Sequence, residues 1–282
     1  MPKQPAATPE DTDSTPTAGT TADARPDTVS ALERGIAVLR CFSEERRIIS
    51  HTDLSRLTGI PRPTVTRLAG TLVTLGLLKQ DPQTERFALA AGVVSLARAF
   101  LAGLDVRAVA RPLMQGLAEA SGGSVYLAVR DGLEMVLVEA CRARSSMLST
   151  RLDVGSRAPM ANAALGRAYL GAIAAPEREA LIESLRLARG TDWAYLVPGL
   201  RSALDDMRQH GYCLSAGEFH REINSVSVPL TGPDGEVMAL NCGGAAFAFT
   251  EERLRADIAP RLLALAQALA SEIGGHVPHP LT

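Results

Sequence analysis

The stretch from residue 52 to residue 76 constrains the fold most, because it predicts two short helices joined by a tight turn. Thr52 carries a hydroxyl that can cap the first helix, and Gly59 can end that helix in the left-handed conformation. Pro63 suits the first position of the second helix, where its missing N–H group costs nothing. We therefore expect a helix-turn-helix unit.

The second of these helices has one apolar face and one small, polar face. Its apolar stripe has the spacing of a single helical face and consists of Val65, Leu68, Leu72 and Leu75. The opposite face, with Arg62 at its N-terminal end, holds Thr66, Arg67, Gly70 and Thr74. Such a helix suits the major groove of DNA. Taken alone, the same pattern fits an ordinary helical hairpin in a globular core equally well.

A predicted hairpin follows the second helix at once. Residues 77–80 and 86–89 have the pattern of short strands, and residues 81–85 have that of a turn. A helix-turn-helix followed by such a hairpin is a winged helix, whose wing tip usually lies against phosphates, and this favours DNA binding. The residues that we predict to contact DNA are Arg62, Pro63, Thr64, Thr66, Arg67, Gly70, Gln83, Thr84 and Arg86.

Further segments flank this unit. Residues 1–27 are rich in Pro, Thr, Ala and Asp and have almost no large apolar side chains, which predicts a disordered tail. Ser30 and Glu33 have the pattern of a capping box that opens a first helix. Residues 91–102 predict a helix that is unusually apolar for a surface. It is either buried within the chain or, as we prefer, pairs two chains through Val93, Val94, Leu96 and Phe100.

The rest of the chain alternates strand and helix patterns. Asp131-Gly132 is a strong signal for a two-residue hairpin turn, and Pro112 predicts that a helix breaks or kinks at Arg111. The predicted strands are residues 124–130, 133–140, 147–152, 212–216, 223–230 and 236–242. The predicted helices are residues 113–120, 162–173, 176–187, 198–209 and 250–273, the last capped by Thr250. Hairpins with helices on one side indicate a largely antiparallel sheet.

The first part of the chain resembles the N-terminal domain of the IclR family of bacterial transcription regulators. Helix spacing, glycines and wing turn agree together, over residues 31–39, 54–60, 61–68, 71–76 and 81–86. The chain departs from the family at Ala69-Gly70, where bulkier apolar residues are more usual, and at Glu85, where the wing often has Gly. The resemblance implies a winged helix-turn-helix and a linker helix that packs against its mate in a dimer.

The later part resembles the effector-binding domain of the same family, with motifs at residues 154–159, 163–168, 211–219 and 225–229. This resemblance implies a GAF-like sheet flanked by helices, and hence an α+β chain. We expect a disordered tail, a DNA-binding domain, a linker and dimerisation helix, an effector-binding domain and a flexible C-terminus, at residues 1–27, 28–90, 91–104, 105–275 and 276–282.

Charge and cysteine usage limit the class of protein. The whole chain has a formal net charge of −2, whereas residues 28–90 contain nine Arg and Lys against six Asp and Glu. That modest positive excess suits a few phosphate contacts. None of the four cysteines forms a Cys-x-x-Cys pair, so we expect no metal and no cofactor. We find neither a secretion signal nor an apolar run near the ~20 residues of a membrane span, which favours a cytoplasmic protein.

The chain lacks the patterns of a nucleophile elbow, a Walker phosphate loop or a His-Glu-x-x-His zinc site. His210 and Cys213 straddle a predicted helix end, and we interpret their spacing as accidental. Small polar residues lie on otherwise apolar segments of the C-terminal region, where each needs a partner in the protein or in a ligand. We predict that an effector is bound by Gly155, Ser156, Arg157, Ser215, Ser225, Ser227 and Asn241.

Backbone donors and hydroxyls of this kind suit a small organic acid, which is also the effector class that the resemblance implies. The sequence therefore favours a transcription regulator that binds double-stranded operator DNA as a homodimer or tetramer, with no catalytic site and no membrane partner. The alternative is a metabolite-binding enzyme that carries a winged helix as a protein-interaction module. The identity of the effector and the sign of regulation stay open.

Overall fold

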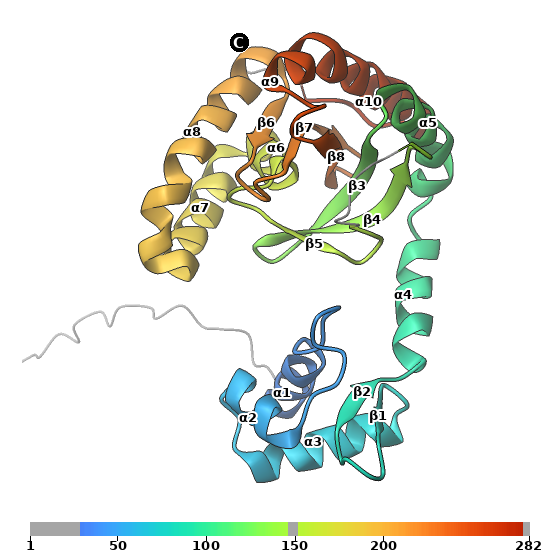
Figure 1. Ribbon diagram of the computed structural model, residues 1–282, viewed down its shortest axis with the longest axis vertical. Helices are drawn as coiled ribbons and strands as arrows, with labels where there is room; N and C mark the ends of the chain where they lie inside the picture. The colour runs from blue at the N-terminus through green and yellow to red at the C-terminus, as the bar shows by residue number, and fades with distance from the viewer. Residues whose placement is uncertain (1–28, 146–151, 279–282) are drawn as a thin grey trace, which may run out of the picture. The chain divides into compact units, whose positions relative to one another are not determined.

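A computed structural model describes residues 29–145 and 152–278, and the chain divides into two compact units between Arg98 and Ala99 (Figure 1). The described elements of the first unit are α1 (Ser30–Leu39), α2 (His51–Thr58), α3 (Arg62–Thr74), β1 (Leu78–Gln80) and β2 (Phe87–Leu89). β1 and β2 pair antiparallel, which completes the predicted winged helix-turn-helix. α4 (Gly92–Ala102) runs across the division between the units.

A small core holds the first unit together. Each of its helices and the wing contribute to it, through Val38, Leu54, Val65, Ala69, Leu72, Leu78 and Phe87 among others. Ile49 forms an antiparallel bridge with Phe87, which attaches the base of the wing to the start of α2. The prediction that Leu75 belongs to the apolar stripe of α3 is wrong, because Leu75 is the C-cap of this helix and is 64 % exposed. Ala69 is fully buried in the stripe instead.

Three predicted helix starts in this unit need correction. α2 is capped by Ser50 rather than Thr52, because the Ser50 hydroxyl both accepts from the N–H of Asp53 and donates to its carboxylate. α1 starts without a side-chain cap, so Ser30 and Glu33 form no capping box. Pro63 is the second residue of α3 and not the first. Gly59 ends α2 with φ 68°, as predicted.

The second unit is built on a six-stranded sheet in the order β5-β4-β3-β8-β7-β6. Its strands are β3 (Ser124–Asp131), β4 (Glu134–Arg142), β5 (Arg157–Pro159), β6 (Cys213–Ala216), β7 (Ile223–Thr231) and β8 (Val237–Ala245). Every pair of neighbouring strands is antiparallel, which confirms the predicted sheet type and the α+β class. The predicted β3–β4 hairpin forms, but its two loop residues are Gly132 and Leu133 instead of Asp131 and Gly132, because Asp131 still pairs with Glu134 and Gly132 takes the left-handed conformation at φ 64°.

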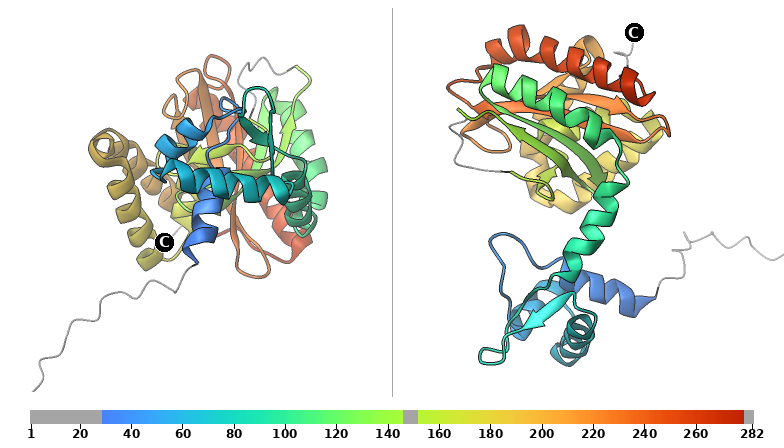
Figure 2. Two further views of the ribbon diagram at one scale, coloured as in Figure 1. Left: turned by 90° about the horizontal axis from the view of Figure 1, so that it is seen from below. Right: turned by 90° about the vertical axis from the view of Figure 1, so that its right-hand side faces the viewer.

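Helices cover both faces of this sheet, not one face as predicted (Figure 2). One face packs against α5 (Val106–Ser121) and α10 (Ala259–Ile273). A short helix, α9 (Glu251–Arg253), and a π-helical turn (Leu254–Ile258) come directly before α10. The other face packs against α6 (Ala164–Ala172) and α8 (Trp193–His210). α7 (Ala175–Arg189) leads through a 3-10 turn (Gly190–Asp192) into α8. Each face of the sheet carries an apolar core, and successive residues of β3 enter opposite cores, Val125 and Leu127 on one side and Tyr126 and Ala128 on the other.

Two helix boundaries that we predicted at prolines are wrong. α5 continues through Pro112 instead of breaking at Arg111, because its buried side chains Val106, Ala110 and Met114 form one stripe that spans the exposed proline. α8 likewise starts before Pro198, at Trp193. The predicted strand at residues 147–152 lies outside the described residues except for Leu152, which is not in a strand. No described helix is long and apolar enough to cross a membrane.

Candidate DNA-binding surface and effector cavity

The outward face of α3 presents Arg62, Thr66, Arg67 and Gly70 to solvent. Val65, Ala69 and Leu72 fix this orientation, since they are buried against the other helices of the unit. Neither arginine is in an ion pair with any residue that the structure describes. The face is therefore small, polar and cationic, as predicted.

The side chains on this face are held in defined positions by the helix itself. The hydroxyl of Thr66 donates to the carbonyl of Arg62 at 3.1 Å, and that of Thr74 donates to Gly70 at 3.1 Å. A hydroxyl bound in this way keeps its lone pairs free to accept from a base or a water molecule. A Cβ atom added at Gly70 would meet nothing within 4 Å, so this stretch of the face is open. Pro63 is exposed and Thr64 is half-buried at the start of the helix.

The wing turn is built around Asp81. Its carboxylate accepts from the backbone N–H groups of Gln83 at 2.8 Å and Thr84 at 2.9 Å. The N–H of Thr84 is the largest cause that holds the pKa of Asp81 below its usual value. Glu85, at φ 53°, is in the left-handed region that glycine usually occupies. The turn leaves the side chains of Gln83, Thr84 and Arg86 exposed.

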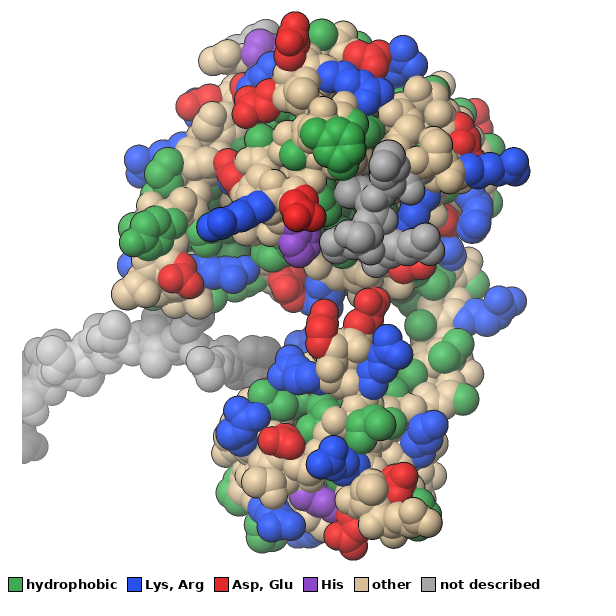
Figure 3. All heavy atoms as spheres, in the orientation of Figure 1, with side chains coloured by type: hydrophobic (Ala, Val, Ile, Leu, Met, Phe, Trp, Pro, Cys, Tyr) green, Lys and Arg blue, Asp and Glu red, His purple; other side chains and the backbone are tan. Residues whose placement is uncertain are grey.

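The surface of the first unit carries charged side chains of both signs. Basic and acidic side chains are interspersed over the face of this unit drawn in Figure 3. A surface of this kind binds a polyanion through a few arginines at defined positions, and not through a continuous basic patch.

A small cavity of about 40 Å³ lies in the second unit, on the sheet face that α6 covers. Its polar side chains are those of Tyr126, Ser225 and Asn241, on three neighbouring strands. The apolar part of the lining consists of Leu152, Ala158, Ala163, Ala164, Leu165, Phe219, Ile223 and Gly243. A volume of this size has room for about one or two water molecules.

The predicted effector-binding residues do not all share this cavity. Ser225 and Asn241 line it, whereas Gly155, Ser156, Arg157, Ser215 and Ser227 do not. The serines Ser215, Ser225 and Ser227 nevertheless lie on the same face of the sheet as Asn241, as strand alternation predicts. The prediction of one shared cavity therefore needs correction.

Protein groups already satisfy the residues that lie outside the cavity. Ser215 donates to the carbonyl of Asn162 at 2.7 Å, and Ser227 accepts from the amide of Asn241 at 2.8 Å. The hydroxyl of Ser156 accepts from the N–H of Asp153 in its turn. The guanidinium of Arg157 binds Glu134 and Asp131, and the N–H of Gly155 donates to Leu137.

Sequence reasoning missed the aromatic and aliphatic lining. Tyr126 shares a strand face with Ala128, and it is opposite Asn241 in the register of β3 and β8. Alternation along β3 was a usable signal for Tyr126. Phe219 lies on a loop, where periodicity gives no such signal, and Ile223 is the first residue of β7.

Cys213 and His210 do not form a nucleophilic pair. Cys213 is fully buried, and its thiol lies 3.4 Å from the carbonyl of Ala164. Burial raises the pKa of this thiol to about 12. A thiol in that state provides no thiolate near neutral pH. Within the described residues, no cluster of His, Cys, Asp and Glu could hold a metal ion.

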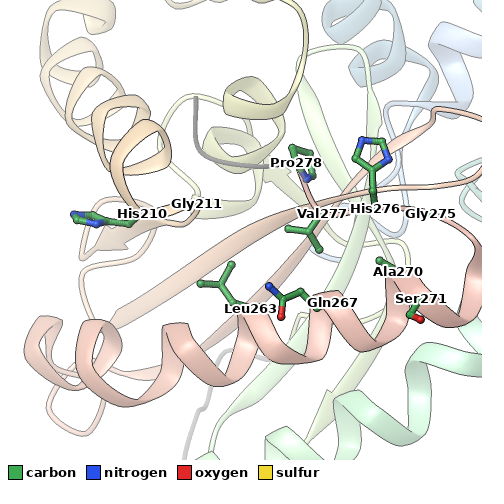
Figure 4. Close-up of a pocket in the computed structure, with 10 residues that line it drawn as sticks. All are labelled: His210, Gly211, Leu263, Gln267, Ala270, Ser271, Gly275, His276, Val277 and Pro278. Carbon is green, nitrogen blue, oxygen red and sulfur yellow. The ribbon is translucent and has the colours of Figure 1, made fainter. Parts of the chain in front are cut away.

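A larger cavity, of about 470 Å³, lies between the C-terminal end of α8, α10 and residues 275–278 (Figure 4). None of the predicted site residues lines it. His210 and His276 come from opposite ends of this cavity, and their rings do not point toward a common centre in Figure 4. A ligand site needs polar groups that converge, so the smaller cavity is the better candidate.

Comparison with known proteins agrees with both units. Residues 98–271 match the family model described as the C-terminal region of bacterial transcriptional regulator IclR, and residues 31–82 match the IclR helix-turn-helix domain. The chain is 31 % identical over 247 residues to the HTH-type transcriptional regulator TsaQ1/TsaQ2 of Comamonas testosteroni, which covers 87 % of this chain and 88 % of that protein.

Solved structures give the same result. A regulator from Brucella abortus is 38 % identical with a TM-score of 0.84, and the match covers 91 % of this chain and 97 % of that one. A homologue from Microbacterium hydrocarbonoxydans, solved in complex with 4-hydroxybenzoate, shares the fold with a TM-score of 0.65 at 22 % identity, over 86 % of this chain and 97 % of that one.

Proposed function

The chain belongs to the IclR family of bacterial transcriptional regulators, and we propose that a small organic acid sets its affinity for an operator. It is a DNA-binding regulator and not an enzyme. We further propose that it acts as a dimer, or a dimer of dimers, on a roughly palindromic site. Two copies of one winged helix read two half-sites related by the same symmetry.

The observation that carries the DNA-binding role is the outward face of α3, where two arginines without an ion pair in the described structure flank Thr66. A mobility shift on the DNA upstream of the chain's own gene tests it. We expect specific retardation that weakens steeply as salt is raised, because phosphate contacts release counterions. A shift that is absent or insensitive to salt would favour a protein-interaction role for the winged helix.

Direct readout is assigned to Arg62 and Thr66, and a phosphate contact to Arg67. Arg62→Ala is expected to cost roughly 1–3 kcal/mol on the operator and to relax preference at one base position, since base-edge contacts carry sequence information. Arg67→Ala is expected to weaken operator and random DNA alike. Titrations of both variants on both DNAs measure the difference. Equal losses on the two DNAs for both variants would refute the assignment.

The wing is expected to contact the backbone through Gln83, Thr84 and Arg86. Arg86→Ala should lower the slope of log affinity against log salt by about 0.9, which is the contribution of one phosphate contact. Binding isotherms at several salt concentrations give the slope. Arg201→Ala removes one exposed positive charge from α8 and serves as the control, with no change expected. An unchanged slope for Arg86→Ala would place this side chain away from DNA.

The effector is proposed to occupy the cavity lined by Ser225 and Asn241. The lining includes no Lys or Arg, so a carboxylate there would depend on neutral donors such as the hydroxyls of Ser225 and Tyr126 and the amide of Asn241. The cavity of about 40 Å³ must enlarge to admit any organic acid, since ligand pockets span about 300–1,000 Å³. Effector binding therefore requires a second arrangement of this unit.

Two serine variants test the location of this site. Ser225→Ala is expected to weaken the effector by about 1.5–3 kcal/mol, the cost of a lost hydrogen bond to a charged group. Ser156→Ala removes a hydroxyl that lies outside the cavity, so it should leave the affinity unchanged. Calorimetric titration with 4-hydroxybenzoate, after a thermal-shift comparison with aliphatic acids, provides the measurement. A loss in the Ser156 variant with none in the Ser225 variant would move the site to the β4–β5 edge.

A further inference from the structure

We propose that Arg167 and Glu218 form a latch that holds the walls of the effector cavity together, so that these two residues set the effector affinity without contacting the effector. The inference rests on the proposed effector site and concerns its regulation. Arg167 belongs to α6 and is only 2 % exposed, which is unusual for an arginine. Glu218 lies on the loop between β6 and β7, which we call the rim loop (residues 217–222).

The buried guanidinium joins three segments of the chain. Its Nε donates to the carbonyl of Ala161 at 3.0 Å, and its Nη1 donates to the carbonyl of Leu214 at 3.0 Å. Its Nη2 forms an ion pair with the carboxylate of Glu218. Arg167 thereby ties the segment before α6 to β6 and to the rim loop, and every one of these partners is an acceptor that a buried cation needs.

Asn162 adds a second connection between the same two segments. Its side-chain amide donates to the carbonyl of Glu218 at 3.0 Å, while its own carbonyl accepts from the hydroxyl of Ser215 at 2.7 Å. The two connections meet at Glu218, through its side chain and its backbone. The rim loop is therefore held against the start of α6 mainly at this one residue.

These segments are the walls of the effector cavity. Ala163, Ala164 and Leu165 line it from the α6 side, and Phe219 and Ile223 line it from the rim-loop side. Phe219 directly follows Glu218, so movement of Glu218 displaces a cavity wall. Because the cavity has only about 40 Å³, admission of an organic acid requires these walls to separate. The latch opposes that separation.

Gly199 of α8 shows how closely the latch is enclosed. A Cβ atom added there would lie 2.7 Å from Nη2 of Arg167 and 2.7 Å from both carboxylate oxygens of Glu218. The Glu218 side chain is 38 % exposed and has room to yield, whereas that of Arg167 is buried. Gly199→Ala is therefore a way to displace Glu218 from the latch without a change of charge.

Loss of the latch is expected to increase the effector affinity. A ligand that binds only the open arrangement has its apparent affinity reduced by the fraction of molecules that are open. Glu218→Gln and Gly199→Ala raise that fraction, so each should bind 4-hydroxybenzoate about threefold more tightly or better. A role limited to folding predicts the opposite, weaker binding by a less stable protein.

Hydrogen exchange tests the latch independently of the effector. In the full-length protein, amides of the rim loop and of Ile223 should exchange about tenfold faster in both variants, because local opening exposes them. The N–H groups of Gly217 and Ile223, which donate to Ile223 and His220, are the direct reporters. Asp205→Asn is the matched control, since it neutralises an exposed carboxylate that pairs with Arg208 on α8, and it should leave rim exchange and binding unchanged.

Several outcomes decide between latch and scaffold. Unchanged rim exchange in both variants would overturn the latch, and so would a uniform acceleration over the whole second unit with a lowered melting temperature. Faster rim exchange with tighter 4-hydroxybenzoate binding supports it. Faster rim exchange with no binding by any form of the protein also supports the latch, and the failure then belongs to the proposed effector class.

Discussion

Val94→Asp combined with Phe100→Asp is expected to yield monomers and to lower operator affinity about 100-fold or more, because two linked half-site contacts are reduced to one. Val94, Leu96 and Phe100 of α4 are 64 %, 64 % and 52 % exposed in the single chain. No described residue of α4 is buried, although the helix is strongly apolar. Apolar area of this kind on a helix calls for a partner, and we propose that the partner is a second copy of this chain.

Sedimentation velocity and operator titration measure the two parts of this result. Ser95→Asp with Ala102→Asp is the matched control, since it adds the same charges to the opposite side of α4. The control should stay dimeric and bind the operator as the unaltered protein does. A stable dimer of the Val94 and Phe100 variant would show that the chains meet through another surface.

Local signals explain why the winged helix was predictable. Gly59 fixes the end of α2, and Asp81 organises the wing turn with bonds to residues two and three positions away. Interactions over so short a separation are visible in the sequence. Glu85 is the exception, because its left-handed backbone at φ 53° follows from the turn and not from its residue type.

The residues that line the proposed effector cavity were much harder to predict from the sequence. Strand alternation puts Ser215, Ser225 and Ser227 on one face of the sheet, but it does not show which of these hydroxyls the protein itself satisfies. That depends on partners far along the chain, such as the carbonyl of Asn162 for Ser215, 53 residues away. The buried cation of Arg167 was missed for the same reason, since its acceptors lie up to 51 residues away.

Proline rules failed where tertiary packing is stronger than a local preference. Pro112 removes one hydrogen bond from α5, yet Met114 and Leu117 beyond it are buried together with Val106 and Ala110 before it. Burial of side chains of this size is worth about 1.5–3 kcal/mol each, which outweighs the cost of the proline.

Gly166→Ala is expected to destabilise the second unit by about 3 kcal/mol, the upper part of the range for overpacking. α6 approaches the chain before it so closely that a Cβ at Gly166 would lie 2.2 Å from Cα of Met160 and 2.5 Å from its carbonyl oxygen. Both contacts are with backbone atoms, which cannot rotate away. The helix itself has to move, and with it the cavity wall formed by Ala163, Ala164 and Leu165.

Differential scanning calorimetry should show the melting temperature of Gly166→Ala lowered by roughly 6–12 °C, at about 2–4 °C per kcal/mol for a unit of this size. Gly116→Ala on α5 is the control, because a Cβ there meets nothing within 4 Å. Alanine is the better helix former by about 1 kcal/mol, so this control should melt at the same temperature or higher. If Gly166→Ala melts with the control, α6 does not pack against the Met160 backbone, and the wall of the effector cavity is misplaced. If it melts early and also loses 4-hydroxybenzoate binding while Gly199→Ala gains it, then displacing the α6 wall and releasing the rim loop have opposite effects on the same site.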